Sequence, residues 1–230
     1  MSMRLRCWLA GTTLLVGGVM AGSCHLLNSD STTDVAQLAM NAPLRGPIHL
    51  ALFAGGMLVL LGWFGYYSLE TSRSGAVGLA FVCLFLGIIW ADLLHSILEF
   101  SIFPVLAAVA PYALPRLADA TYRSVPVSML LEAGECLLFV GVPAAAWAIY
   151  RSEAARAWPV FPFALTAALQ ALALIPRWGD TLRSWSLTAL YFSLATLGVA
   201  VLCSARARTD TGFQTSGGSA ISCEDSPPAA

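Results

Sequence analysis

The sequence has 230 residues, of which 58% are hydrophobic and 11% are charged, whereas a soluble domain carries about 25% charged residues. This composition excludes an ordinary soluble protein. The net charge of −1 at pH 7, without a run of basic residues, also excludes nucleic acid as a partner, because nucleic-acid-binding surfaces are strongly basic. All 12 basic residues are arginine, a usage typical of GC-rich bacterial genomes, and we therefore expect a bacterial cell membrane.

Long apolar segments recur along the chain. The hydrocarbon core of a bilayer is about 30 Å thick, so about 20 helical residues are needed to cross it. The segments predicted to cross are 7–27, 48–68, 76–99, 126–150, 158–176 and 185–204. The sequence therefore predicts an all-α fold, a polytopic membrane helix bundle with about six transmembrane helices over residues 1–204, with the lipid bilayer as its partner.

The orientation and the first segment are predicted from flanking residues. Ala21-Gly22-Ser23 resembles a signal-peptide cleavage site, but the apolar run continues to Leu27, and we therefore predict an uncleaved first helix. With the amino terminus inside, seven arginines lie on the inner side and five on the outer side. Because cytoplasmic loops carry the excess of basic residues, this distribution predicts that both termini are cytoplasmic.

Two loops and the tail have compositions that predict their conformations. Ser31-Thr32-Thr33-Asp34 is typical of the start of a helix, here a short one along the membrane surface. Pro104, Pro111 and Pro115 predict that 100–125 forms an interfacial or re-entrant cap and not an unbroken helix. The polar residues 205–230 are predicted to be disordered.

Glycine pairs predict where helices approach each other closely. Gly17-Gly18 lie in the first segment and Gly55-Gly56 in the second. Small residues allow helix backbones to pack together in a membrane. We expect these pairs to be packing surfaces and not phosphate-binding loops.

About a quarter of the chain resembles a known group. The motifs are Pro47-Ile48-His49-Leu50, Leu61-Gly62-Trp63-Phe64-Gly65-Tyr66-Tyr67, Ser74-Gly75-Ala76-Val77-Gly78-Leu79 and Phe103-Pro104 with Ala110-Pro111. In these motifs, roughly residues 47–111, the sequence resembles an uncharacterised family of predicted multi-pass bacterial membrane proteins. The resemblance implies a helical membrane fold and no particular activity.

Ionisable residues cluster in one half of the predicted spans. Because residues three and four apart share a helix face, Asp92, His95 and Glu99 are expected on one face of the third span. The full set, all in the outer halves of their spans, is His25, His49, Asp92, His95, Glu99, Glu132 and Glu135. Buried ionisable residues in membrane helices are candidates for function. The pattern predicts an outward-facing intramembrane polar chamber.

The residue types in this chamber are those of a metal site. We predict ligands from His95, Glu99, Glu132 and Glu135, since a histidine and a glutamate four residues apart can reach one ion. Asp92 and His49 are expected in the second shell or as additional ligands. Zinc, iron and manganese all accept such ligands. A metal-bound water, with Glu132 or Glu135 as general base, would support hydrolysis of an amphiphilic substrate.

Three other interpretations fit the same residues. The first is a structural interhelical polar network without catalysis. The second is a small-solute or proton-coupled transporter, against which the apolar inner halves of the spans count. The third is a bis-His haem protein with His49 and His95 as axial ligands, against which the neighbouring carboxylates count. The sequence does not decide whether the protein is an enzyme.

Overall fold

The computed structural model describes residues 3–27, 35–70, 75–110, 112–152, 158–175 and 179–216. Within these ranges the chain is helical and contains no strand, which confirms the predicted all-α fold. The helices are α1 (Met3–Leu27), α2 (Val35–Leu69), α3 (Gly75–Ile88), α4 (Leu94–Ile97), α5 (Phe103–Val109), α6 (Leu114–Tyr122), α7 (Val125–Tyr150), α8 (Val160–Leu172) and α9 (Gly179–Ser216). Two π-helical turns, η1 (Ile89–Leu93) and η2 (Leu98–Ile102), join α3, α4 and α5 into one helical rod.

Among the described residues, five helical segments are long and apolar enough to cross a membrane. These are Met3–Leu27, Arg45–Leu69, Val77–Val109, Val125–Tyr150 and Leu182–Arg206. The predicted segment 158–176 is also helical, but α8 has only 13 residues and is about 20 Å long, which is too short to span a hydrocarbon core. The chain therefore has the helices of an integral membrane protein, with five full-length candidate spans where the sequence predicted six.

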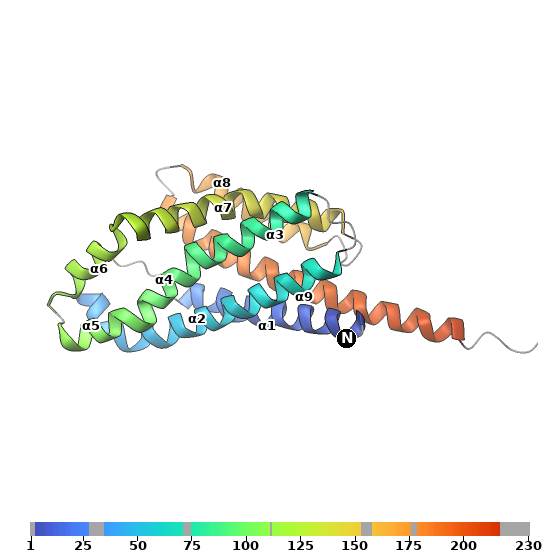
Figure 1. Cartoon of the computed structure of the whole chain (residues 1–230), viewed down its shortest axis with the longest axis horizontal. Coiled ribbons are helices and arrows are strands. Elements are labelled where there is room, and N and C mark those ends of the chain that lie inside the picture. The colour runs from blue at the N-terminus through green and yellow to red at the C-terminus, as the bar shows by residue number, and fades with distance from the viewer. Residues whose placement is uncertain are drawn as a thin grey trace, which may run out of the picture.

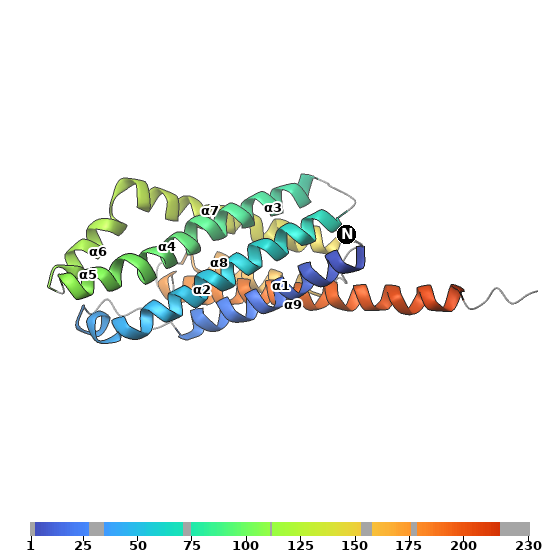
Figure 2. The same cartoon turned by 60° about the horizontal axis from the view of Figure 1, so that its bottom comes forward.

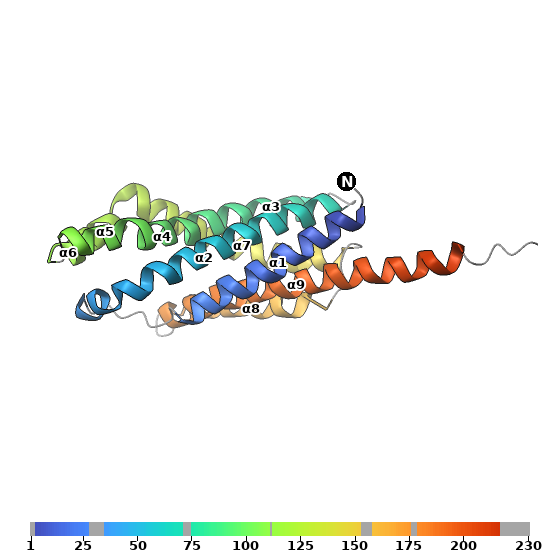
Figure 3. The same cartoon turned by 90° about the horizontal axis from the view of Figure 1, so that it is seen from below.

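The long helices lie side by side along one axis (Figure 1). The short helices α5 and α6 lie at one end of the bundle, which we call the capped end. The helix α1 begins at the opposite end, and there α9 extends beyond the other helices (Figures 2 and 3). The helix α9 continues to Ser216, past the predicted end of the last span at residue 204. Residues 217–230 of the predicted tail lie outside the described residues.

The segment before the second span is also helical. The helix α2 begins at Val35 and runs without interruption to Leu69, so no separate surface helix forms. Ala36, Leu38 and Met40 are strong helix formers, which favours continuation of the helix in this direction. Residues 28–34, with the predicted helix start, lie outside the described residues.

The proline-rich segment interrupts the third span later than predicted. The helix passes Pro104, which follows the π turn η2 directly. It ends at Val109, and the next residue, Ala110, has φ −143° and ψ 62°, because a residue before a proline is driven out of the helical region. Pro115 then lies in the first turn of α6, where its missing N–H has no partner to lose. The chain thus turns back at the capped end.

Glycines bring α1 against α2 and α9. A Cβ on Gly17 would lie 2.6 Å from the carbonyl oxygen of Gly55, and a Cβ on Gly18 would lie 2.5 Å from the carbonyl oxygen of Tyr191. The backbones therefore touch, as the glycine pairs predicted. These contacts place the capped ends of α1, α2 and α9 around the polar residues of the third span.

Candidate metal centre

Two π turns set the directions of the polar side chains on the third span. Asp92 lies in η1, His95 in α4 and Glu99 in η2. A π turn has more residues per turn than an α-helix, so it rotates the following side chains away from regular α-helical positions; such turns are frequent at functional sites. The three residues, expected on one face, consequently contact two different groups of helices.

Asp92 faces α1 and α9. Its Oδ1 lies 3.2 Å from Nε2 of His25, and the hydroxyl of Tyr191 donates a hydrogen bond to its Oδ2. The rings of His25 and Tyr191 are stacked, with centroids 5.4 Å apart. All three residues are buried. Among the described residues, the hydrogen-bond and ion-pair contacts of Asp92 are to His25 and Tyr191 and not to His95, and its predicted role beside the metal ligands stays a prediction.

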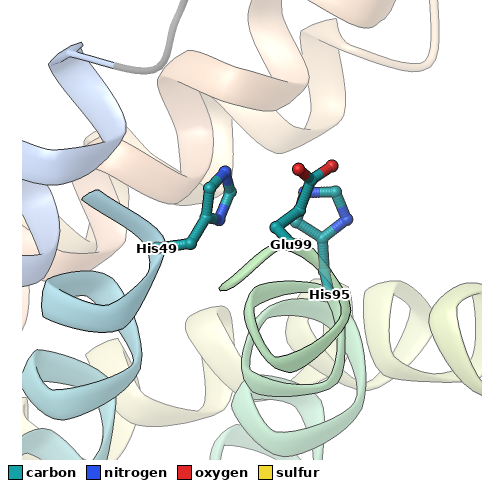
Figure 4. A group of neighbouring side chains, drawn as sticks. All are labelled: His49, His95 and Glu99. Atoms are coloured by element: carbon teal, nitrogen blue, oxygen red, sulfur yellow. The ribbon is translucent and has the colours of Figure 1, made fainter. Parts of the chain in front are cut away.

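His95 and Glu99 face α2 instead, where they meet His49. One potential ligand atom from each of the three side chains lies within 4.8 Å of the others. The rings of His49 and His95 are in edge-to-face contact, with centroids 5.4 Å apart. Figure 4 shows the three side chains, which project from their two helices into the same space. His49, predicted as an additional ligand, is therefore a central member of the site.

The imidazole of His49 is fully buried. Its exposed fraction is 0%, and neither Nδ1 nor Nε2 has a partner among the described residues. A buried polar group without a partner costs about 1–3 kcal/mol. A cation at this position would be bound by an imidazole lone pair and would remove part of that cost.

Tyr122 from α6 joins His95 to Glu99. Its hydroxyl lies 3.0 Å from Nδ1 of His95 and 3.0 Å from Oε1 of Glu99. Burial, and next the nearby carboxylate of Glu99, raise the pKa of the Tyr122 hydroxyl well above its ordinary value, so it stays protonated and donates to Glu99. It then accepts a hydrogen bond from Nδ1–H of His95. This arrangement leaves Nε2 of His95 with its lone pair.

Glu132 and Glu135, the other two predicted ligands, lie away from this group. Glu132 is exposed on α7, and Oε1 of Glu135 lies 3.3 Å from Nη1 of Arg183 on α9. The reason is the packing of Gly134, where a Cβ would lie 2.5 Å from the backbone nitrogen of Ala91 in η1. Because Gly134 faces the third span, its neighbours at positions 132 and 135 are directed to other sides of α7.

The geometry also bears on the haem interpretation. Axial imidazoles of a bis-His haem lie on opposite faces of a macrocycle. In this structure the rings of His49 and His95 are in direct edge-to-face contact, with centroids 5.4 Å apart. The grouping of His49, His95 and Glu99 fits the metal-site interpretation, and the bis-His haem interpretation stays a prediction.

Sequence reasoning missed two residues of interest. Tyr122 carries no sequence signal, because only the turn of the chain at Ala110 brings α6 back against His95. Glu70, at the end of α2, is buried and accepts a hydrogen bond from Ser152, which follows α7. The sequence analysis made no prediction for Glu70, because its contact with Ser152 joins two residues far apart in the sequence.

Comparison of the chain with protein-family models, with curated proteins and with solved structures found no match. The resemblance of residues 47–111 to a membrane protein family therefore stays a prediction.

Proposed function

We propose that this integral membrane protein binds one divalent metal ion near the capped end through His49, His95 and Glu99. The observation that supports the proposal is the buried His49, whose two ring nitrogens have no partner among the described residues while ligand atoms of His95 and Glu99 lie within 4.8 Å. The ligands come from two helices, so binding of the ion would also hold α2 against the α3–α5 rod.

The ligand set favours a catalytic ion over a purely structural one. Two imidazoles and one carboxylate leave at least one coordination position for water or substrate, as in catalytic zinc sites, and the same set also suits iron or manganese. A metal ion held by these residues would supply a water activated as a nucleophile near neutral pH. Since the site lies at the end of a membrane bundle, we propose hydrolysis of an amphiphilic substrate as the activity.

Glu132 and Glu135 are not the general bases of this proposal. Glu132 is exposed and Glu135 pairs with Arg183, whereas the hydroxyl of Tyr122 lies next to the ligands. We assign Tyr122 as a positioning residue that fixes the ring of His95. The structural-network interpretation fits Asp92, whose carboxylate contacts both His25 and Tyr191. The transporter interpretation stays a prediction.

Elemental analysis of the detergent-purified protein tests the metal site. We expect about one zinc, iron or manganese ion per chain, and loss of the ion in His49→Ala and in Glu99→Gln. Glu132→Gln is the matched control, because this carboxylate is exposed on α7, and it should retain the ion. Folded protein that stays without metal after incubation with each ion, or equal metal content in all variants, would contradict the proposal.

A second assay tests the activity. Ester and phosphoester amphiphiles in mixed micelles are incubated with the protein, with chelator-treated protein and with chelator-treated protein to which the ion has been returned. We expect hydrolysis that the chelator abolishes and the ion restores. Metal-loaded protein that hydrolyses none of these amphiphiles would refute the hydrolase assignment and leave the metal site standing.

A further inference from the structure

A second site lies between α7, α8 and α9, and none of its residues is a proposed metal ligand. It is a pocket of about 440 Å³, within the usual range of about 300–1,000 Å³ for small-molecule sites. The lining is mostly apolar, with Leu138, Phe139 and Leu187 among the lining residues. Phe139 is 41% exposed, so the pocket reaches the outer surface of the bundle, where lipid chains would lie.

Polar groups of both charges also line this pocket. Arg183 and Glu135 form an ion pair of 3.3 Å, and their side chains are 56% and 41% exposed, so both retain room for a further partner. The Oε1 atom of Gln170 is buried and has no hydrogen-bond partner among the described residues. The pocket thus offers one cationic donor, one carboxylate acceptor and one unpaired amide acceptor.

On α7 and α9, though not beside α8, where Ala173 and Leu174 follow Gln170 toward the capped end, the polar lining groups lie nearer the capped end than the apolar ones. In α7, Glu135 lies on the capped-end side of Leu138 and Phe139, and in α9, Arg183 lies on the capped-end side of Leu187. A ligand with a polar head toward the capped end and an apolar chain toward the middle of the bundle matches this order. That is the shape and the orientation of a membrane lipid.

We propose that this pocket binds a zwitterionic membrane lipid whose head group carries a phosphate and a primary ammonium. The guanidinium of Arg183 would bind the phosphate. The ammonium has three N–H donors, which match the carboxylate of Glu135 and the unpaired Oε1 of Gln170. The apolar lining would hold part of one acyl chain. This charge complementarity selects the head group, and the site does not depend on the metal.

Native mass spectrometry of the full-length protein tests the selectivity. Phosphatidylethanolamine, phosphatidylcholine and phosphatidylglycerol with identical acyl chains compete at equal concentrations. Phosphatidylcholine has no N–H donor on its nitrogen and phosphatidylglycerol has no cation. We expect phosphatidylethanolamine to be retained about tenfold more than either, which corresponds to one or two additional net hydrogen bonds. Equal retention of the three lipids would overturn the proposal.

Variants connect the selectivity to the residues. Arg183→Gln should weaken the binding of all three lipids, because each has a phosphate, whereas Glu135→Gln and Gln170→Leu should remove only the preference for phosphatidylethanolamine. The matched control is Arg123→Gln, which breaks an exposed ion pair between Nε of Arg123 and Oδ1 of Asp119, 2.7 Å apart. This variant should retain the three lipids as the parent protein does.

A separate variant tests the pocket without changing a charge. Ala173 lines the pocket, and Ala173→Trp should lower the retention of all three lipids. Size-exclusion profiles identify variants that do not fold, and these are excluded from the comparison. Unchanged lipid retention in folded Arg183→Gln and Ala173→Trp would place the bound lipids elsewhere and overturn the proposal.

Discussion

The hydroxyl of Tyr122 lies 3.0 Å from Nδ1 of His95, although the two residues are 27 positions apart in the sequence. Because the same hydroxyl donates to Glu99, it accepts a hydrogen bond from Nδ1–H of His95, which leaves the lone pair on Nε2. In metal sites the hydrogen bond on one ring nitrogen sets which nitrogen binds the ion. Tyr122, which α6 places at the capped end, therefore determines which nitrogen of His95 is available to bind the ion.

Tyr122→Phe should weaken metal binding and leave the number of ions per chain unchanged. Loss of a hydrogen bond to a metal-binding histidine typically lowers metal affinity about 10- to 100-fold. Competition with a chromophoric chelator measures the affinity. Tyr112→Phe is the control, because Tyr112 is 99% exposed. If Tyr122→Phe binds the ion as tightly as the parent protein, Tyr122 does not position His95.

Asp92→Asn should lower the stability of the bundle and leave the metal in place. The substitution removes the negative charge between His25 and Tyr191, and a buried group left without its partner costs about 1–3 kcal/mol. Thermal unfolding in detergent measures the effect, and elemental analysis measures the metal. Asp119→Asn, in an exposed ion pair, should unfold like the parent. Loss of metal without loss of stability would assign Asp92 to the metal centre.

The fold was largely predictable, because hydropathy alone locates apolar helices. All six predicted segments are helical, with the difference that α8 is too short to span. Hydropathy does not reveal where a helix ends when the flanking residues also favour helix, and so α2 begins earlier and α9 ends later than predicted. The glycine contacts of Gly17 and Gly55 were predicted correctly, because steric size is a local property.

The candidate site was predictable only in part. Helical periodicity grouped Asp92 with His95 and Glu99, but the π turn η1, which contains Asp92, changes the spacing, and Asp92 contacts His25 and Tyr191 on other helices. Periodicity also shows that Glu132 and Glu135 are near each other and does not show which face of α7 meets the third span. That face is set by Gly134 against Ala91, a long-range contact between two helices.

Two glycine-to-alanine substitutions should have opposite effects. In Gly17→Ala the new Cβ would lie 2.6 Å from the carbonyl oxygen of Gly55, so α1 and α2 must separate, at a cost of about 1–3 kcal/mol. In Gly78→Ala nothing lies within 4 Å of the new Cβ, and the higher helix propensity of alanine should stabilise α3 by about 0.5–1 kcal/mol. Thermal unfolding of both variants in one detergent shows whether the unfolding temperature falls in Gly17→Ala and rises in Gly78→Ala. Equal shifts of the unfolding temperature in the two variants would show that α1 and α2 do not pack through the contact between Gly17 and Gly55.

Ser152→Ala should increase local opening of the helices at the end of the bundle opposite the capped end. Ser152 donates a hydrogen bond to the buried carboxyl of Glu70, and this contact joins the end of α2 to the end of α7. Removal of the donor leaves a buried acceptor with fewer partners, at a cost of about 1–3 kcal/mol. Hydrogen exchange should increase at the ends of these two helices and remain unchanged around His49. Ser68→Ala is the control, since this exposed hydroxyl donates a hydrogen bond to the carbonyl oxygen of Gly65 within its own helix. Faster exchange around His49 would instead indicate that the two ends of the bundle are coupled.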